Sequence, residues 1–268
     1  MNLTATADLL ALDELARQDL PLQRMDARVK LVVTLAFIVT VMSFPRYDIS
    51  ALAPLFLFPA AMFALGGLPF KRLVRPLLAA APFAVLVGLA NPLLDRAPLE
   101  VGGGLILARG WFSFASILVR FGLAVSAAFA LTASTGMHRL CGSLAGLGVP
   151  QALAVQVWLL YRYLFVLAEE AGRLIRSVRV RSADRPRLGP SLAARLTGVL
   201  LLRAMARAER IHQAMLARGF DGRFRLEQPP AVRVRDLAAA LAWLAFFAAA
   251  RTWNLADALG RLIAPGVP

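Results

Sequence analysis

Four long apolar runs separate short polar or basic segments in the first half of the chain. Each run approaches the roughly twenty residues that cross the hydrocarbon core of a bilayer as a helix. Proline lies inside two of them, and proline bends a helix. The pattern therefore predicts four spans, at residues 31–44, 51–65 with Pro54 and Pro59, 77–94 with Pro82 and Pro92, and 111–135.

The second half of the chain shows a different pattern. Residues 151–168 are apolar enough to cross a membrane, but Arg162 interrupts them and an arginine-rich segment follows. A crossing here would place that segment outside, against the positive-inside rule. We therefore expect residues 151–181 to form one helix lying obliquely in or beneath the membrane. Residues 191–218 are expected to form a second long helix, and residues 237–250 the fifth and last span.

Composition and charge support this topology. Apolar residues make up 59% of the 268 residues, yet the net charge is +14. Fifteen of the thirty basic residues lie between residues 169 and 235, which predicts that this segment is cytoplasmic. The predicted fold class is an all-α integral membrane protein with about five transmembrane helices, and long cytoplasmic helices inserted before the last. The predicted parts are residues 1–150, 151–235 and 236–268.

Two segments outside the predicted spans are less apolar. Residues 6–20 mix leucines with acids and predict a short amphipathic helix on a surface rather than a cleavable signal. Residues 95–110 are mixed in charge and contain Gly102 to Gly104, which favours an outer loop.

Arg120 is the one charge inside the predicted spans, and the sequence indicates no partner for it.

The second long helix carries two stripes at helical spacing. Gly219 and Gly222 predict that this helix ends in a left-handed cap. One stripe is basic and the other mostly apolar: Arg203, Arg207, Arg210, Ala214 and Arg218 on one side, and Leu201, Met205, Ala208, Ile211, His212 and Met215 on the other.

The first long helix ends in a similar way. Arg173, Ser177 and Arg181 share one face, and Arg181 is followed by a small residue, Ser182, as Arg218 is followed by Gly219. A small residue lets another backbone approach while the arginine reaches past it. Two such tips suit two similar grooves on a dimer of partner subunits. The alternative is a solvated amphipathic helix with an incidental terminal arginine.

Motifs for catalysis are missing from the sequence. The glycine–lysine loop that holds nucleotide phosphates is absent, and no acid falls inside a predicted span, as proton-coupled carriers require. His138 and Cys141 have metal-compatible spacing but lack further ligands nearby, so a structural or interfacial histidine is the better interpretation. The basic segment lacks the interleaved aromatics of a nucleic-acid platform, so no nucleic acid is expected.

These motifs together resemble the transmembrane (T) component of energy-coupling factor transporters, closest to the cobalt-type CbiQ branch. The resemblance rests on Val180-Arg181-Ser182 and Ala217-Arg218-Gly219, with Arg210 upstream and Asp221 behind, and runs from about residue 20 to 250. The first motif usually begins with alanine, where this chain has Val180. Shorter matches lie at residues 26–31, 44–45, 147–150, 161–165 and 169–170.

The resemblance implies a scaffold in a bacterial inner membrane. It would join two cytoplasmic ATPases, which hydrolyse ATP, to a membrane subunit that binds the cobalt ion, with or without a small accessory subunit. Arg181 and Arg218 would each enter an ATPase groove, supported by Arg173, Arg207, Arg210 and Asp221, and the chain itself would bind neither metal nor cofactor. Nickel or another substrate, an enzyme acting on lipid headgroups through residues such as Glu169 and Glu170, and a homo-oligomeric channel stay open as alternatives.

Overall fold

The computed structural model describes residues 13–45, 49–94, 98–101, 105–181, 189–221 and 232–252. Contacts within the chain divide it into two compact units. We call them the apolar unit, with described residues between 13 and 140 and from 232 to 252, and the arginine-rich unit, with described residues between 141 and 221. The prediction of an all-helical membrane protein is confirmed, with one small β-hairpin as its exception.

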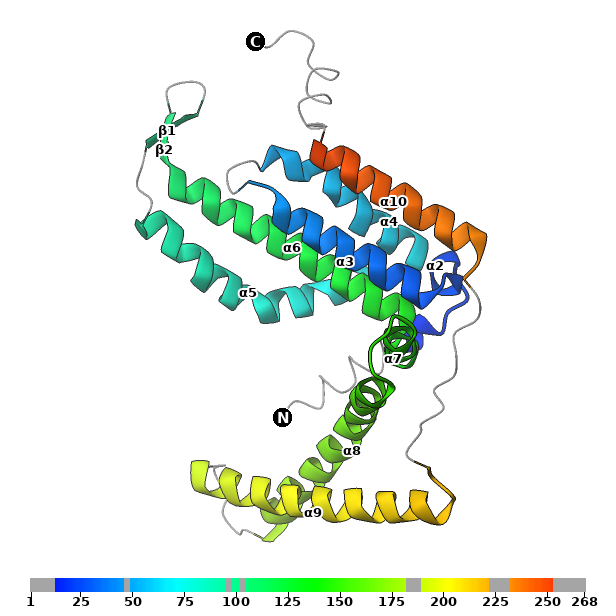
Figure 1. Cartoon of the computed structure of the whole chain (residues 1–268). Coiled ribbons are helices and arrows are strands. Elements are labelled where there is room, and N and C mark those ends of the chain that lie inside the picture. The colour runs from blue at the N-terminus through cyan, green and yellow to red at the C-terminus, as the bar shows by residue number, and fades with distance from the viewer. Residues whose placement is uncertain are drawn as a thin grey trace. The chain divides into compact units, whose positions relative to one another are not determined.

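The apolar unit is a bundle in which α3 contacts both α6 and α10, and α4 contacts α6 (Figure 1). Aromatic side chains fill its centre: the ring centroids of Phe37 and Phe58 lie 4.6 Å apart, and Phe247 is 5.5 Å from Phe37. These rings join the first, second and last predicted spans. The elements of the unit are α2 (Pro21–Arg24), α3 (Ala27–Ser43), η1 (Ser50–Phe56), α4 (Leu57–Gly66), α5 (Phe70–Leu94), α6 (Arg109–Thr135), the first turn of α7 (Met137–Gly146), and α10 (Val234–Thr252).

Among the described residues, three helices are long and apolar enough to cross a membrane, at Phe70–Pro92, Gly110–Thr135 and Gln151–Arg181. Helices α3 and α10, the expected first and last spans, have 17 and 19 residues. The expected second span is divided into a 3₁₀ helix, η1, and α4. Pro54 lies inside η1 and Pro59 in the first turn of α4, which agrees with the predicted bend.

Two boundaries differ from the sequence prediction. Helix α5 begins at Phe70 rather than at residue 77, because Pro76 is accommodated inside the helix together with Pro82 and Pro92. The predicted outer loop contains an antiparallel hairpin, β1 (Pro98–Val101) with β2 (Leu105–Ala108). Its apolar and β-branched residues favour strands on both sides of Gly102 to Gly104, which lie outside the described residues.

Arg120 has a structural partner. Its guanidinium donates to the carbonyl oxygen of Pro45 at 2.5 Å, just beyond the end of α3. An arginine within a spanning helix is costly in hydrocarbon unless backbone carbonyls or other polar groups receive its protons. Arg120 therefore ties the middle of α6 to the end of α3, a contact between residues 75 apart that the sequence did not show.

Polar contacts also tie together the opposite end of the bundle, where α3 begins. The Nζ of Lys30, a buried side chain, donates to the Ser134 carbonyl at 3.1 Å. The carboxylate of Asp236 on α10 accepts from the Asp26 backbone N–H at 3.2 Å. Arg139 donates to the carbonyls of Ala16 and Gln23, at 2.6 and 2.9 Å. The start of α7 is thereby fixed to the N-terminal part of the apolar unit.

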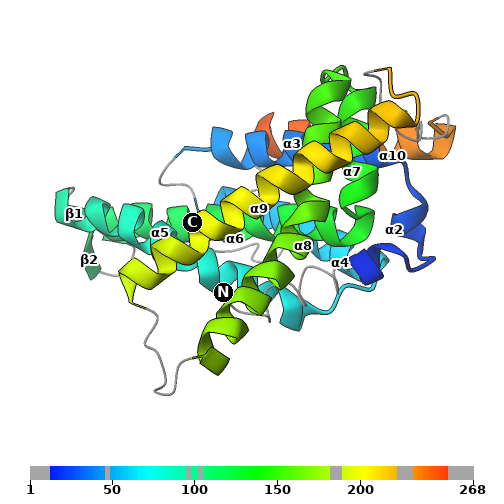
Figure 2. The ribbon, with the colours of Figure 1, turned by 90° about the horizontal axis from the view of Figure 1, so that it is seen from below.

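The arginine-rich unit is built on two long helices that cross, as both views show (Figures 1 and 2). Helix α8 (Gln151–Arg181) has 31 residues and α9 (Pro190–Ala217) has 28, so the helices are about 46 and 42 Å long. The prediction of two long helices in these ranges is confirmed. Pro190 occupies the first turn of α9, where its missing N–H is tolerated.

Candidate functional site

Helix α9 ends in the left-handed cap that its glycine predicts. Gly219 has φ = 81°, a backbone conformation that side chains disfavour. Its N–H donates to the Leu216 carbonyl at 2.9 Å, and the Phe220 N–H donates to the Met215 carbonyl at 3.0 Å. This pair of bonds is the Schellman motif, which terminates a helix sharply. Arg218 is therefore held at the helix end, exposed to solvent.

Helix α8 also ends at an arginine. Arg181 is its last residue, exposed, and the preceding Val180 is 86% exposed. Ser182 lies outside the described residues, so the small residue after Arg181 stays a sequence prediction.

The other predicted residues lie along the same two helices. Arg207 is half-buried, whereas Arg210 and Ala217 are exposed on α9. Asp221 is exposed just beyond the cap. Arg173 forms ion pairs with Glu169 and Glu170 on α8. The structure places the two tips on the same unit.

The half-buried face of α9 coincides with neither of the two stripes predicted from polarity. The half-buried face includes Leu200, Ala204, Arg207, Ile211 and Met215, so it takes residues from both predicted stripes. This face follows the 4, 3, 4, 4 spacing that a helix presents to a neighbour, and α9 is in contact with α8.

An apolar surface on α9 stays exposed as a result. Leu201 is 59%, Leu202 69% and Met205 61% exposed, and no described residue of α9 is fully buried. These side chains therefore leave most of their apolar surface exposed in the chain as described. In a membrane-associated helix, such residues are available to lipid or to another subunit.

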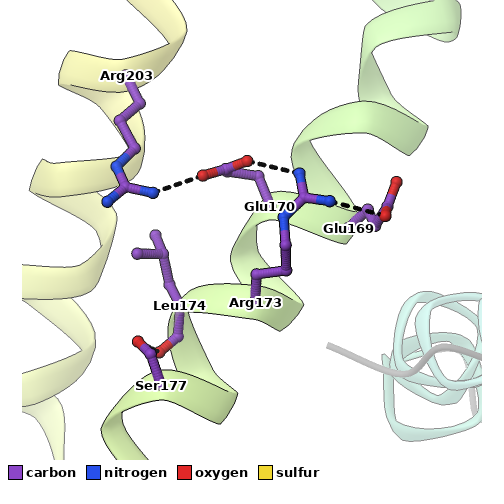
Figure 3. A network of polar contacts seen from close by, with 6 residues as sticks. All are labelled: Glu169, Glu170, Arg173, Leu174, Ser177 and Arg203. Atoms are coloured by element: carbon purple, nitrogen blue, oxygen red, sulfur yellow. Dashed lines mark hydrogen bonds and ion pairs between the residues drawn. The ribbon is translucent and has the colours of Figure 1, made fainter.

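A network of polar contacts joins α8 to α9 (Figure 3), and its link between the two helices was not found from the sequence. Arg203 on α9 donates to Glu170 Oε1 at 2.6 Å, while Arg173 donates to Glu170 Oε2 at 2.6 Å. Arg173 also donates to Glu169 at 2.8 Å. The pairs within α8 have i,i+3 and i,i+4 spacing and were visible in the sequence. The pair with Arg203 spans 33 residues, so only the fold reveals it.

The two guanidinium groups also influence the protonation of Glu170. Hydrogen bonds from Arg173 and then Arg203 hold the pKa of the Glu170 carboxyl below its ordinary value. The hydrogen bond to Glu170 raises the pKa of Arg173 in return. Both residues lie in the charged C-terminal half of α8, beyond its apolar residues 151–168. The network therefore stays charged across the physiological pH range.

The residues with metal-binding chemistry do not gather in the described part of the chain. No group of three or more histidine, cysteine, aspartate or glutamate side chains that could hold a metal ion is found there. Cys141 is a buried free cysteine, and burial raises the pKa of its thiol. A buried, protonated thiol is a poor metal ligand. For Cys141 this favours a packing role over metal binding.

Comparison with known proteins identifies the family. A search of curated proteins gives no match. Residues 18–230 match the model of the family CbiQ, described as cobalt transport protein. This range covers most of the chain and includes both arginine-tipped helices. The long apolar helices agree with a multi-pass membrane component of a transporter. The chain therefore belongs to the CbiQ family of cobalt transport proteins.

Proposed function

We propose that this chain is the coupling subunit of an energy-coupling factor importer for cobalt(II). It would connect two cytoplasmic ATPase subunits to a separate membrane subunit that binds the substrate. The observation that supports this proposal most strongly is the pair of long crossing helices, each ending at an exposed arginine. The family match supports cobalt as the transported ion.

Each arginine tip would bind one ATPase subunit. A guanidinium carries five donors in a planar fork, which suits carboxylates or backbone carbonyls lining a groove. At the end of α9, Gly219 adds no side chain, and a Cβ there would meet nothing within 4 Å inside this chain. A partner's backbone can therefore approach the α9 tip closely. Ser182 would allow the same approach next to Arg181.

The mechanism uses the length of the two helices. Closure of the ATPase dimer on ATP would draw the two tips together, and rigid helices would transmit that movement over their length of more than 40 Å. The exposed apolar residues of α9 and the apolar first half of α8 would then shift against the substrate-binding subunit. In this proposal the partner subunits hydrolyse ATP and bind cobalt. The complex, with or without a small accessory subunit, would lie in a bacterial inner membrane.

Charge reversal at the tips tests this function. The variant Arg181→Glu/Arg218→Glu should lose ATPase subunits during purification and lose cobalt uptake, while its amount in the membrane stays unchanged. The matched control is Arg176→Glu/Arg195→Glu, because both arginines are exposed on the same helices, lie away from the tips and are not among the predicted coupling residues. The control should retain most ATPase binding. Normal uptake by the tip variant would reject the proposed function.

A further inference from the structure

The crossing of α8 and α9 lies well back from both arginine tips. Glu170 precedes Arg181 by eleven residues, and Arg203 precedes Arg218 by fifteen. At the helical rise, the two arms measure about 16 and 22 Å. A rotation of about 10° at the crossing would therefore displace each tip by roughly 3 to 4 Å. Small changes at Glu170 and Arg203 become large changes in the spacing of the tips.

Apolar packing does little to fix the angle of this crossing. Helix α9 has no fully buried residue, and within the charged half of α8 only Leu174 is buried. Ridges and grooves of large side chains usually set a crossing angle, and here few such side chains are enclosed. The polar contacts between the helices must therefore carry much of the geometric restraint.

Glu170 has the geometry for that restraint. Its two carboxylate oxygens accept from arginines on different helices, both at 2.6 Å, and its side chain is 14% exposed (Figure 3). Neighbouring Glu169 is 68% exposed and bonds only within α8. Exposed ion pairs add little stability, but charge-assisted bonds on one carboxylate are directional. Glu170 is therefore expected to restrain the crossing angle of α8 and α9 rather than to add stability.

We infer that Glu170 is a positioning residue that sets the crossing of α8 and α9 and thereby the spacing of Arg181 and Arg218. This inference rests on the proposed coupling function for its role in transport, but its geometric part does not depend on that function. The carboxylate holds Arg203 on one oxygen and Arg173 on the other, and Glu169 holds Arg173 from the opposite side. In the proposed complex, this spacing would determine how the two tips are presented to the ATPase grooves.

The geometric part is tested on the purified full chain without other subunits. Spin labels are placed by Val180→Cys and Ala217→Cys in a Cys141→Ser background, and the label-to-label distance distribution is measured. Glu170→Gln should broaden the distribution at least twofold, because the neutral amide no longer pairs with two guanidinium groups. Glu169→Gln should leave it unchanged. A distribution in Glu170→Gln as narrow as in the parent overturns the inference.

The role in transport is tested in the complete complex with its ATPase and substrate-binding subunits. Glu170→Gln should retain the ATPases on purification but lower the cobalt imported per ATP hydrolysed several-fold, and Glu169→Gln should not. Wild-type coupling in Glu170→Gln overturns the positioning role even where the distances broaden. Failure of the proposed function itself gives a different result, since unmodified complexes would then lack ATPases while the distance measurement would stand.

Discussion

Replacing Gly219 by alanine is a sharp test of how the α9 tip is built. The backbone at this position has φ = 81°, and a Cβ would meet nothing within 4 Å. The cost of the substitution is therefore conformational rather than a clash, about 1–2 kcal/mol for a residue with a side chain in the left-handed region. This cost falls on the cap alone, because the two bonds that close it are donated by Gly219 and Phe220.

Hydrogen exchange of the backbone amides measures that cost directly. About 1–2 kcal/mol corresponds to a roughly 5- to 30-fold loss of protection. We expect this loss in Gly219→Ala at the amides of residues 219 and 220, with exchange in α8 unchanged. ATPase binding should weaken as well, because Arg218 is no longer held at a fixed helix end.

Gly198 provides the matched control. It lies in the middle of α9 with ordinary helical geometry, and a Cβ there would also meet nothing within 4 Å. Gly198→Ala should therefore increase protection in α9, by about 0.5–1 kcal/mol of helix propensity. The reasoning is refuted if Gly219→Ala leaves protection unchanged, or if both alanine variants lose it equally.

Three further predictions concern the ion-pair network and the apolar unit. Folding favours the ionised form of Glu170, because the pKa of its carboxyl lies below the ordinary value. The restraint of the helix crossing is therefore present above the ordinary glutamate pKa of about 4.3 and is lost only as the pH falls below it. The spin-label distances should accordingly be constant from pH 8 to pH 5 and broaden only in stronger acid; broadening already at pH 6 would contradict this. Arg120→Met leaves the Pro45 carbonyl without its charged donor, so it should lower the unfolding free energy in detergent by about 1.5–3 kcal/mol. An unchanged melting temperature would show that this hydrogen bond is dispensable. Phe37→Ala, at a fully buried site, should cost about 3–5 kcal/mol through the lost burial of the ring and the cavity left behind, whereas Leu35→Ala, at a position 53% exposed, should cost much less in the same thermal assay.

Local features of the two long helices were predictable from the sequence. The glycine after Arg218 predicted a left-handed cap, and the structure has that cap because only local backbone geometry is involved. The lengths of α8 and α9 followed from uninterrupted helical spacing. Both arginine tips therefore come from information within a few residues of each end.

Features that depend on distant contacts were not predictable. The two stripes of α9 were defined by polarity alone, whereas the half-buried face includes Arg207 from the basic stripe. The partner of Arg120 is a backbone carbonyl, which carries no sequence signal. Glu170 and Arg203 could be paired only once the two helices were seen to cross. In each case, the missing information was which segments lie side by side.

Thiol labelling at the α8 tip tests the central claim most directly. Val180→Cys in a Cys141→Ser background places one highly exposed thiol beside Arg181 without changing either arginine. A membrane-impermeant maleimide should label it in inverted membrane vesicles but not in right-side-out ones, and bound ATPase subunits should slow the labelling at least tenfold. Labelling from the outside, or equal labelling with and without the ATPases, would contradict a cytoplasmic coupling tip.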